Sequence, residues 1–316
     1  MHSQSNSQAR GNGVIKRAIY LWRLTLLYMA RVVRPGNFQN IAADLDFYRG
    51  TYAKETGQQL EQAQILEVGF GQLPFRLMLL QSLGYNAKGI DLDRPLLRLD
   101  LSTTISIFKT NGPLRTIKSL VRRIAFDSAE YKKFEKFVSS RYGKTLRFQP
   151  DAMVVGSAAD PVTWARAGGP FDFIYSEHVF EHIPRETISR VVDLIADALS
   201  DHGIAIITPN IFTGIIGGHD IGWYRHKVAL SNVSRGPAWG HLTGESEAPD
   251  TFLNKMTRKE YRDLFRIRFV ILQEQTLYAD LGRNYLTAER RVALKDFDDD
   301  ELFSNVVHFV LRKIAR

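Results

Sequence analysis

An acidic residue and two glycines follow a short apolar run in the segment ILEVGFGQLP, residues 65–74. Glu67 precedes Gly69 and Gly71. Glycine at such a place permits a tight turn and lets the backbone approach a ligand without a Cβ in the way. Asp91 follows Gly71 by 20 residues, where a carboxylate can accept hydrogen bonds from both hydroxyls of a ribose. The spacing predicts a nucleoside-binding turn.

The glycine pattern does not suit a dinucleotide. The fingerprint G-x-G-x-x-G would require a third glycine where Pro74 stands, and the carboxylate of Glu67 would repel a pyrophosphate. A ligand with a cationic amino group and a ribose but no phosphate meets both objections, and S-adenosyl-L-methionine is such a ligand. A nicotinamide-dependent oxidoreductase is therefore the weaker alternative. A third possibility is a non-catalytic, membrane-associated binding module on the same fold, although such a module would not need Glu67, Gly69, Gly71 and Asp91.

Strand and helix patterns alternate on both sides of the turn. Continuous apolar strands that alternate with helices indicate a parallel sheet covered on both faces. The expected strands lie within residues 63–68, 86–93, 150–157, 171–176 and 204–210, and the expected helices within 72–84, ended by Gly84, and 185–203, closed by Gly203.

The end of the chain departs from this alternation. Residues 257–265 predict a helix with Thr257 as its N-cap and Glu260 three residues on, the pattern of a capping box. Residues 267–277 and 305–313 then read as two strands without a long helix between them. We expect this pair to form an antiparallel, hairpin-like addition to the sheet edge.

Four segments, in this order and spacing, resemble class I S-adenosylmethionine-dependent methyltransferases: LEVGFG, GIDLD, FDFIYSEHVFEHIP and DHGIAIITPN. The resemblance covers about residues 60–93 and 151–210. It implies an α/β fold with a Rossmann-like, mostly parallel sheet, helices on both faces, the first strand near the middle and an antiparallel last strand. It also implies that S-adenosyl-L-methionine is the cofactor and that the chain is a methyltransferase.

The resemblance further implies which residues bind the cofactor. Matched position by position, they are Glu67, Gly69, Phe70 and Gly71 near the methionine part, Asp91 and Leu92 near the ribose, Ser157 and Ala158 beside the adenine, and Ser176 and Glu177 on the methionine side. Two positions depart from the family pattern. Ser157 stands where an Asp is frequent, with Asp160 as a substitute, and Leu73 stands where a third glycine is common.

Histidines are the candidates for a general base, which a hydroxyl acceptor would need. His178 and His182 lie four residues apart beside Glu177 and Glu181, and His226 follows the fifth expected strand. For each of the three histidines, the alternative to acting as a general base is a structural role or simple exposure to solvent. The same Glu and His spacing could bind a metal, but the family resemblance already accounts for it, and we expect no metal.

Positive charge is concentrated in an insertion. Residues 94–150 carry 13 Lys or Arg and four acids, a difference of 13 − 4 = +9 against +8 for the whole chain. We expect this basic, mainly helical insertion to form a lid or substrate platform inside a methyltransferase domain of residues 38–93 and 151–316. Its charge suits an anionic acceptor, such as a sugar phosphate or a lipid-linked or acidic glycan, or a membrane surface. Nucleic acid is unlikely as a partner because no known binding module is present.

The first 37 residues predict a polar, disordered tail followed by a basic amphipathic helix over residues 14–34. The helix either packs its apolar face on the main domain or lies on anionic lipid, and the sequence leaves both open. Its longest uncharged run, residues 24–30, is too short to span a membrane. The chain has no cysteine, which fits a reducing compartment. We expect a cytoplasmic protein, peripheral at the inner face of the membrane if the helix binds lipid.

Overall fold

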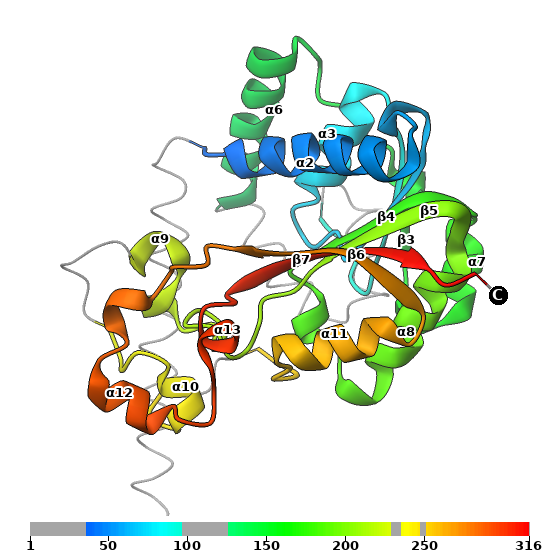
Figure 1. Cartoon of the computed structure of the whole chain (residues 1–316). Coiled ribbons are helices and arrows are strands. Elements are labelled where there is room, and N and C mark those ends of the chain that lie inside the picture. Colours follow the sequence, from blue (N-terminus) through cyan, green and yellow to red (C-terminus); the bar gives the residue numbers. More distant parts are fainter. Residues whose placement is uncertain (1–35, 97–125, 229–234, 247–250, 316) are drawn as a thin grey trace, which may run out of the picture. The chain divides into compact units, whose positions relative to one another are not determined.

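The computed structural model describes residues 36–96, 126–228, 235–246 and 251–315 (Figure 1). The predicted helix over residues 14–34 and the 97–125 part of the insertion lie outside the described residues. The chain divides into two compact units, residues 1–42 with 95–146 and residues 43–94 with 147–316, and each is described separately. Among the described residues, no helix has the length and apolar character that crossing a membrane requires.

The second unit contains a seven-stranded sheet in the order β3-β2-β1-β4-β5-β7-β6. Its strands are β1 Gln64–Val68, β2 Asn86–Asp91, β3 Met153–Val155, β4 Phe171–Glu177, β5 Leu199–Thr208, β6 Phe269–Leu277 and β7 Val306–Lys313. The first five strands pair in parallel, whereas β7 pairs antiparallel with both β5 and β6. This confirms the Rossmann-like, mostly parallel sheet with an antiparallel last strand. The last two strands are antiparallel as expected, but β7 enters between β5 and β6, so β6 forms the edge.

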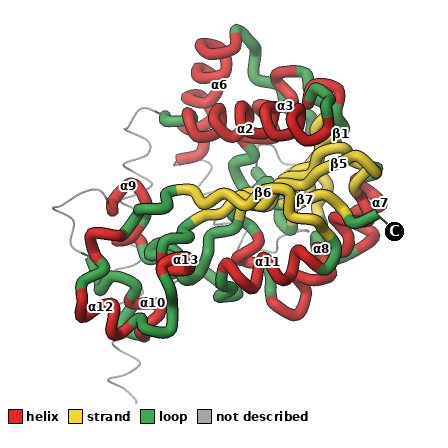
Figure 2. Tube along the Cα trace, in the orientation of Figure 1, coloured by secondary structure: helices red, strands yellow, loops and turns green. Residues whose placement is uncertain are grey.

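Helices cover both faces of this sheet (Figure 2). They are α2 Gln39–Thr56, α3 Phe75–Leu83, α7 Pro161–Ala167, α8 Arg185–Ala198 and α11 Arg258–Arg266. The short helices α9 Arg225–Val228, α10 Gly240–Thr243, α12 Ala288–Ala293 and α13 Asp299–Leu302 lie in the segments after β5 and β6, and residues in and beside them form a separate hydrophobic cluster. On one face, buried side chains of α7, α8 and α11 form a continuous core with Leu66 and Val68 of β1. On the other face, aromatic rings of α2 pack against β4, with the rings of Tyr48 and Phe173 5.3 Å apart.

The expected end of the helix over residues 185–203 is wrong by five residues. Helix α8 ends at Ala198, and β5 begins at Leu199. Gly203 therefore lies inside a strand rather than at a helix terminus. A Cβ there would lie 3.0 Å from the carbonyl oxygens of Phe171 and Asp172, at an irregularity in the β4–β5 pairing. The glycine allows the two strands to approach each other closely.

The described part of the first unit contains α6, Ser128–Tyr142. Phe134 and Val138 of this helix are fully buried. The ring of Phe38 packs edge-on against Phe134, with centroids 5.0 Å apart, and lies 5.6 Å from the ring of Phe137. The exposed face of α6 carries Lys132 and Lys136, so part of the basic charge of the insertion lies on a helix with an apolar inner face.

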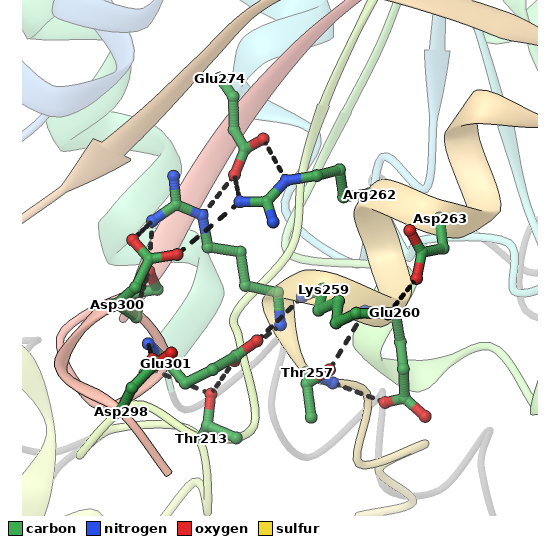
Figure 3. Close-up of polar contacts among 12 residues, drawn as sticks. Thr213, Thr257, Lys259, Glu260, Arg262, Asp263, Glu274, Asp298, Asp300 and Glu301 are labelled. Carbon is green, nitrogen blue, oxygen red and sulfur yellow. Dashed lines mark hydrogen bonds and ion pairs between the residues drawn. The ribbon is translucent and has the colours of Figure 1, made fainter.

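A polar network holds the C-terminal elements together (Figure 3). The predicted capping box is confirmed, because Thr257 and Glu260 each accept a backbone N–H from the other. The carboxylate of Glu301 accepts hydrogen bonds from the backbone N–H groups of Arg258 and Lys259, at 3.0 and 2.9 Å. It also accepts one from the hydroxyl of Thr213, at 2.7 Å. Glu301 thus ties the start of α11 to the loop that follows β5.

Replacing Glu301 by Ala should lower the free energy of unfolding by about 1–2 kcal/mol, the usual cost of losing a helix N-terminal acceptor. Urea denaturation of the full chain measures this change. The control Asp263→Ala removes an exposed partner of Lys259 and should cost less than about 0.5 kcal/mol. Equal effects of the two substitutions would contradict the role given to Glu301.

Candidate functional site

Polar side chains gather where the parallel strands of the second unit end. The chain runs from β1 outward to β2 and β3, and from β4 outward to β5, so the strand order reverses between β1 and β4. Ligands of open α/β sheets bind outside the carboxyl ends of the strands at such a reversal. The predicted residues Gly71, Asp91 and Glu177 follow or end β1, β2 and β4.

The two glycines of the turn serve different purposes. Both have positive φ, +84° at Gly69 and +66° at Gly71, a region that side chains disfavour. A Cβ at Gly69 would lie 2.2 Å from the side chain of Val179, so Gly69 is required for packing. A Cβ at Gly71 would meet no atom of the described residues within 4 Å. Within the described part of the chain, the backbone at Gly71 is therefore open to the approach of a ligand.

Asp91 is bound to this turn and still has capacity for a ligand. Its Oδ2 accepts the backbone N–H of Gly71 at 2.7 Å, and its Oδ1 accepts that of Asp93 at 3.0 Å. Each carboxylate oxygen can accept a second hydrogen bond. Partial burial raises the pKa of Asp91. The next residue, Leu92, is 66% exposed and offers an apolar surface beside the carboxylate.

Glu67 is a buried carboxyl with an unused oxygen. It is 3% exposed, and its Oε2 makes no hydrogen bond of full geometry within the described residues. The hydroxyl of Tyr175, across the sheet on β4, is also buried and does not reach hydrogen-bond geometry. Burial raises the pKa of Glu67 to about 8, although the nearby charge of Arg76 and then the hydroxyl of Tyr175 act in the opposite direction. An unsatisfied buried carboxyl is costly, and a cationic ligand group would satisfy it.

Glu177, at the end of β4, is also buried and is held by two hydroxyls. Its Oε1 accepts from Tyr48 at 2.5 Å and from Thr208 at 3.0 Å. The hydroxyl of Thr208 lies 2.7 Å from Nδ1 of His308, whose ring stacks on Phe47 at 4.5 Å. Burial raises the pKa of Glu177. This chain of contacts fixes the Glu177 carboxyl between α2, β5 and β7.

A cation lies beside these carboxyls. Arg76, in the first turn of α3, pairs with Asp44 of α2 at 2.7 Å, and its charge also lowers the pKa of Glu67 and Glu177. No motif in the sequence points to Asp44, Tyr48 or Arg76. The helical spacing of the buried residues Ala42, Leu45, Tyr48 and Tyr52 is the signal that could have revealed this face of α2.

The other predicted cofactor residues lie at the same ends of the strands. Ser176 is buried and donates to the carbonyl of Val68 at 2.8 Å, which links β4 to β1. The hydroxyl of Ser157 accepts the N–H of Ala159 at 3.1 Å. The carbonyl of Ala158 accepts from Trp164 at 2.8 Å, so the backbone beside the expected adenine position is held by α7.

Two further positions serve the protein's own packing. Phe70 is 4% exposed, and its ring lies 2.5 Å from where a Cβ on Gly89 would stand. Its side chain belongs to the core beneath the turn. Asp160, the suggested substitute for the family's acidic residue, is the N-cap of α7 and accepts from the N–H of Val162 at 3.0 Å.

The predicted histidines separate into different surroundings. His226 is exposed on α9. His178 has a positive φ of 57° and is exposed to solvent on one side; on its other side, desolvation by the surrounding protein and then the charge of Arg76 lower its pKa. His182 lies on the 3-10 turn Phe180–His182, and its Nδ1 is 2.9 Å from the carbonyl of Phe252. The ring of His182 packs edge-on against that of His219, with centroids 5.2 Å apart. No sequence motif indicated His219.

The strand order, with β1 near the middle and an antiparallel last strand, is the arrangement that the resemblance implied. No protein-family model and no curated protein sequence matches the chain.

Solved structures similar to it include three examples. The PH0226 protein of Pyrococcus horikoshii shares 12% identity, with 88% of this chain and 93% of that one covered and a TM-score of 0.42. A TehB-like SAM-dependent methyltransferase of Corynebacterium glutamicum shares 13% identity, with 88% and 94% covered and a TM-score of 0.38. PKMT2 of Rickettsia typhi, crystallised with AdoHcy, shares 15% identity, with 84% and 52% covered and a TM-score of 0.42. Because these likenesses are distant, we base the function on this chain's own residues.

The raised pKa of Glu67 makes stability depend on pH. Between the ordinary value of 4.5 and the folded value of about 8, the folded state keeps a proton that the unfolded state releases. Stability should therefore fall as pH rises through this window, by at most about 1.4 kcal/mol per pH unit. Glu67→Gln should flatten the slope, as measured by urea denaturation of the ligand-free protein at pH 5, 6, 7 and 8. The exposed control Glu186→Gln should retain the wild-type slope, and a Glu67→Gln variant that also retained it would refute the assignment.

Proposed function

We propose that the protein is an S-adenosyl-L-methionine-dependent methyltransferase. The observation that carries this proposal is the buried Oε2 of Glu67, which makes no hydrogen bond of full geometry within the described residues, beside the open turn at Gly71 and the spare acceptor capacity of Asp91. The Glu67 carboxyl suits a cationic amino group, and Asp91 suits a ribose. The open turn at Gly71 allows the ligand to approach the protein backbone closely. A pyrophosphate is unfavourable here, because its negative charge would lie beside the carboxyls of Glu67 and Glu177.

Each residue then has a role that follows from its surroundings. Asp91 accepts ribose hydroxyls while the N–H groups of Gly71 and Asp93 hold its carboxylate in place. Glu67 accepts from the amino group, and Leu92 covers part of the nucleoside with apolar surface. Arg76 keeps the local charge of the carboxyls balanced. Ser157 has a hydroxyl proton to offer to the adenine.

The bound cofactor supplies a methyl group already activated on a sulfonium. The protein's task is therefore to orient the acceptor, exclude water and, for a hydroxyl acceptor, hold or remove a proton. His178 is exposed at the end of β4, next to Glu177. A neutral imidazole can accept a proton; the lowered pKa of His178 keeps its imidazole neutral at physiological pH but also makes it a weaker base. We assign His178 as the candidate base, because Nδ1 of His182 is engaged with the carbonyl of Phe252 and His226 lies on a separate short helix.

The acceptor is, in this proposal, a small molecule, a glycan or a lipid-linked glycan that carries negative charge. The support is the charge of +9 over residues 94–150, part of which lies on the exposed face of α6. Positive potential raises the local concentration of anionic substrates. The same charge supports an association with an anionic membrane surface from the cytoplasmic side.

The cofactor assignment is tested with S-adenosylhomocysteine. Asp91→Ala should weaken its binding, measured by titration calorimetry, by about 1.5–3 kcal/mol, the range for hydrogen bonds to a charged group. The control Asp151→Ala alters an exposed carboxylate at the opposite end of the sheet, just before β3, and should bind normally. Normal binding by a folded Asp91→Ala protein would reject the ribose assignment.

The acceptor class is tested by charge reversal on α6. The double variant Lys132→Glu, Lys136→Glu should bind S-adenosylhomocysteine within about threefold of wild type, under ~1 kcal/mol. Its methylation of an anionic acceptor should fall by about tenfold or more at low salt and recover as salt rises. The control Lys54→Glu, Lys295→Glu changes the net charge equally at exposed sites outside the insertion. Equal losses in the two double variants would contradict a role for the insertion.

A further inference from the structure

A second group of polar side chains lies beyond the cofactor residues. The ligand atoms of Glu181, His182 and His219 all lie within 4.8 Å of one another. Glu181 and His182 belong to the 3-10 turn after β4, and His219 belongs to the loop after β5. The sequence spacing pointed to His178 as the partner of His182, whereas the fold brings His219 to it.

Two of the three residues hold buried ligand atoms to which none of the described residues hydrogen-bonds. Oε2 of Glu181 and Nε2 of His219 have no hydrogen-bond partner. The side chain of Glu181 is 4% exposed and that of His219 is 20% exposed. His219 Nε2 lies 3.9 Å from Oε1 of Glu181, too far for a hydrogen bond. Buried polar atoms are rarely left without a partner, so a water or an ion must satisfy these two, and two such atoms side by side suit one ion.

Neighbouring groups orient the side chains of His182 and Glu181 in the way that is usual for metal ligands. Because a carbonyl only accepts, Nδ1 of His182 must donate to Phe252, which leaves the lone pair on Nε2. Oε1 of Glu181 accepts from the side-chain amide of Asn210 at 2.5 Å. Metal-binding histidines and carboxylates are oriented by such second contacts in the same way.

The loop that carries His219 is held in an unfavourable backbone conformation. His219 has a φ of +54°, which costs a non-glycine residue free energy. A Cβ at Gly217 would lie 2.3 Å from the carbonyl of Ile211, and one at Gly218 2.5 Å from the ring of His241. Thr213 of the same loop is anchored to Glu301. The surrounding packing thus fixes the path of the backbone on which His219 lies near Glu181.

We propose that Glu181, His182 and His219 bind one divalent transition-metal ion, such as Mn²⁺, Fe²⁺, Co²⁺ or Zn²⁺. Two imidazoles and one carboxylate favour these ions over Mg²⁺ and Ca²⁺. Ligands about 2.1 Å from one ion stand roughly 3–3.5 Å apart, so the side chains must close by about 1 Å. Three protein ligands leave coordination positions open, and an oxygen of the methyl acceptor occupies them. The assignment of the acceptor oxygen to these positions rests on the proposed function.

The metal site is tested by titrating the chelator-treated, full-length protein with Co²⁺ alone, by calorimetry and by visible absorption. One ion per chain should bind with a ligand-field spectrum. His219→Asn, which tolerates a positive φ, and Glu181→Gln should each weaken binding at least about tenfold. His202→Ala removes an exposed histidine at the start of β5 and should leave it unchanged. Circular dichroism and thermal melting establish that each variant is folded.

Absence of stoichiometric Co²⁺ binding, or equal binding by wild type and both ligand variants, would overturn the site. The open positions are tested by adding acetohydroxamate, a chelating oxygen donor, which should shift the Co²⁺ spectrum; an unchanged spectrum would overturn the role in acceptor binding. S-adenosylhomocysteine binding is measured separately. Bound Co²⁺ without nucleoside binding would reject the proposed function alone, and the converse would reject the metal site alone.

Discussion

The guanidinium of Arg76 makes it possible to bury two carboxyl groups beneath the glycine turn. Moving an unpaired carboxylate out of water is expensive, and Glu67 and Glu177 both lie in the interior. The charge of Arg76 lowers the pKa of each, but burial outweighs it and both remain raised. The ligand-free site thus holds carboxyls that bind protons readily, and a cationic ligand group would take the place of those protons.

This arrangement requires two helices that have no recognisable motif. Helix α3 presents Arg76, and α2 supplies Asp44 and the hydroxyl of Tyr48. The aromatic face of α2 packs against β4. The packing of the Tyr48 ring in the core therefore also orients its hydroxyl, which donates to Glu177. Packing and site electrostatics are therefore coupled, and a change that shifts α2 would alter both stability and the acidity of Glu177.

Residues 176–182 connect the two candidate sites. Ser176 and Glu177 end β4 beside the cofactor turn, and Glu181 and His182 form the 3-10 turn that faces His219. The side chain of Asn210, just after β5, binds Glu181, and Thr208 in the same strand binds Glu177. One strand end thus positions both groups, which would place an acceptor held by the metal close to the cofactor.

Local sequence determined the elements whose signals are local. Apolar runs marked the five parallel strands, and Thr257 with Glu260 marked the start of α11. Glu67, the two glycines and Asp91 indicated the proposed nucleoside site, because the turn follows its strand directly and Asp91 ends the next parallel strand at the same edge of the sheet. The end of α8 was misplaced because Gly203 serves strand contact, which only pairing with β4 reveals. Only the tertiary structure brought Tyr48, Arg76 and His219 to the site, and inserted β7 between β5 and β6. These contacts join segments far apart in the chain, and no short-range pattern encodes long-range packing.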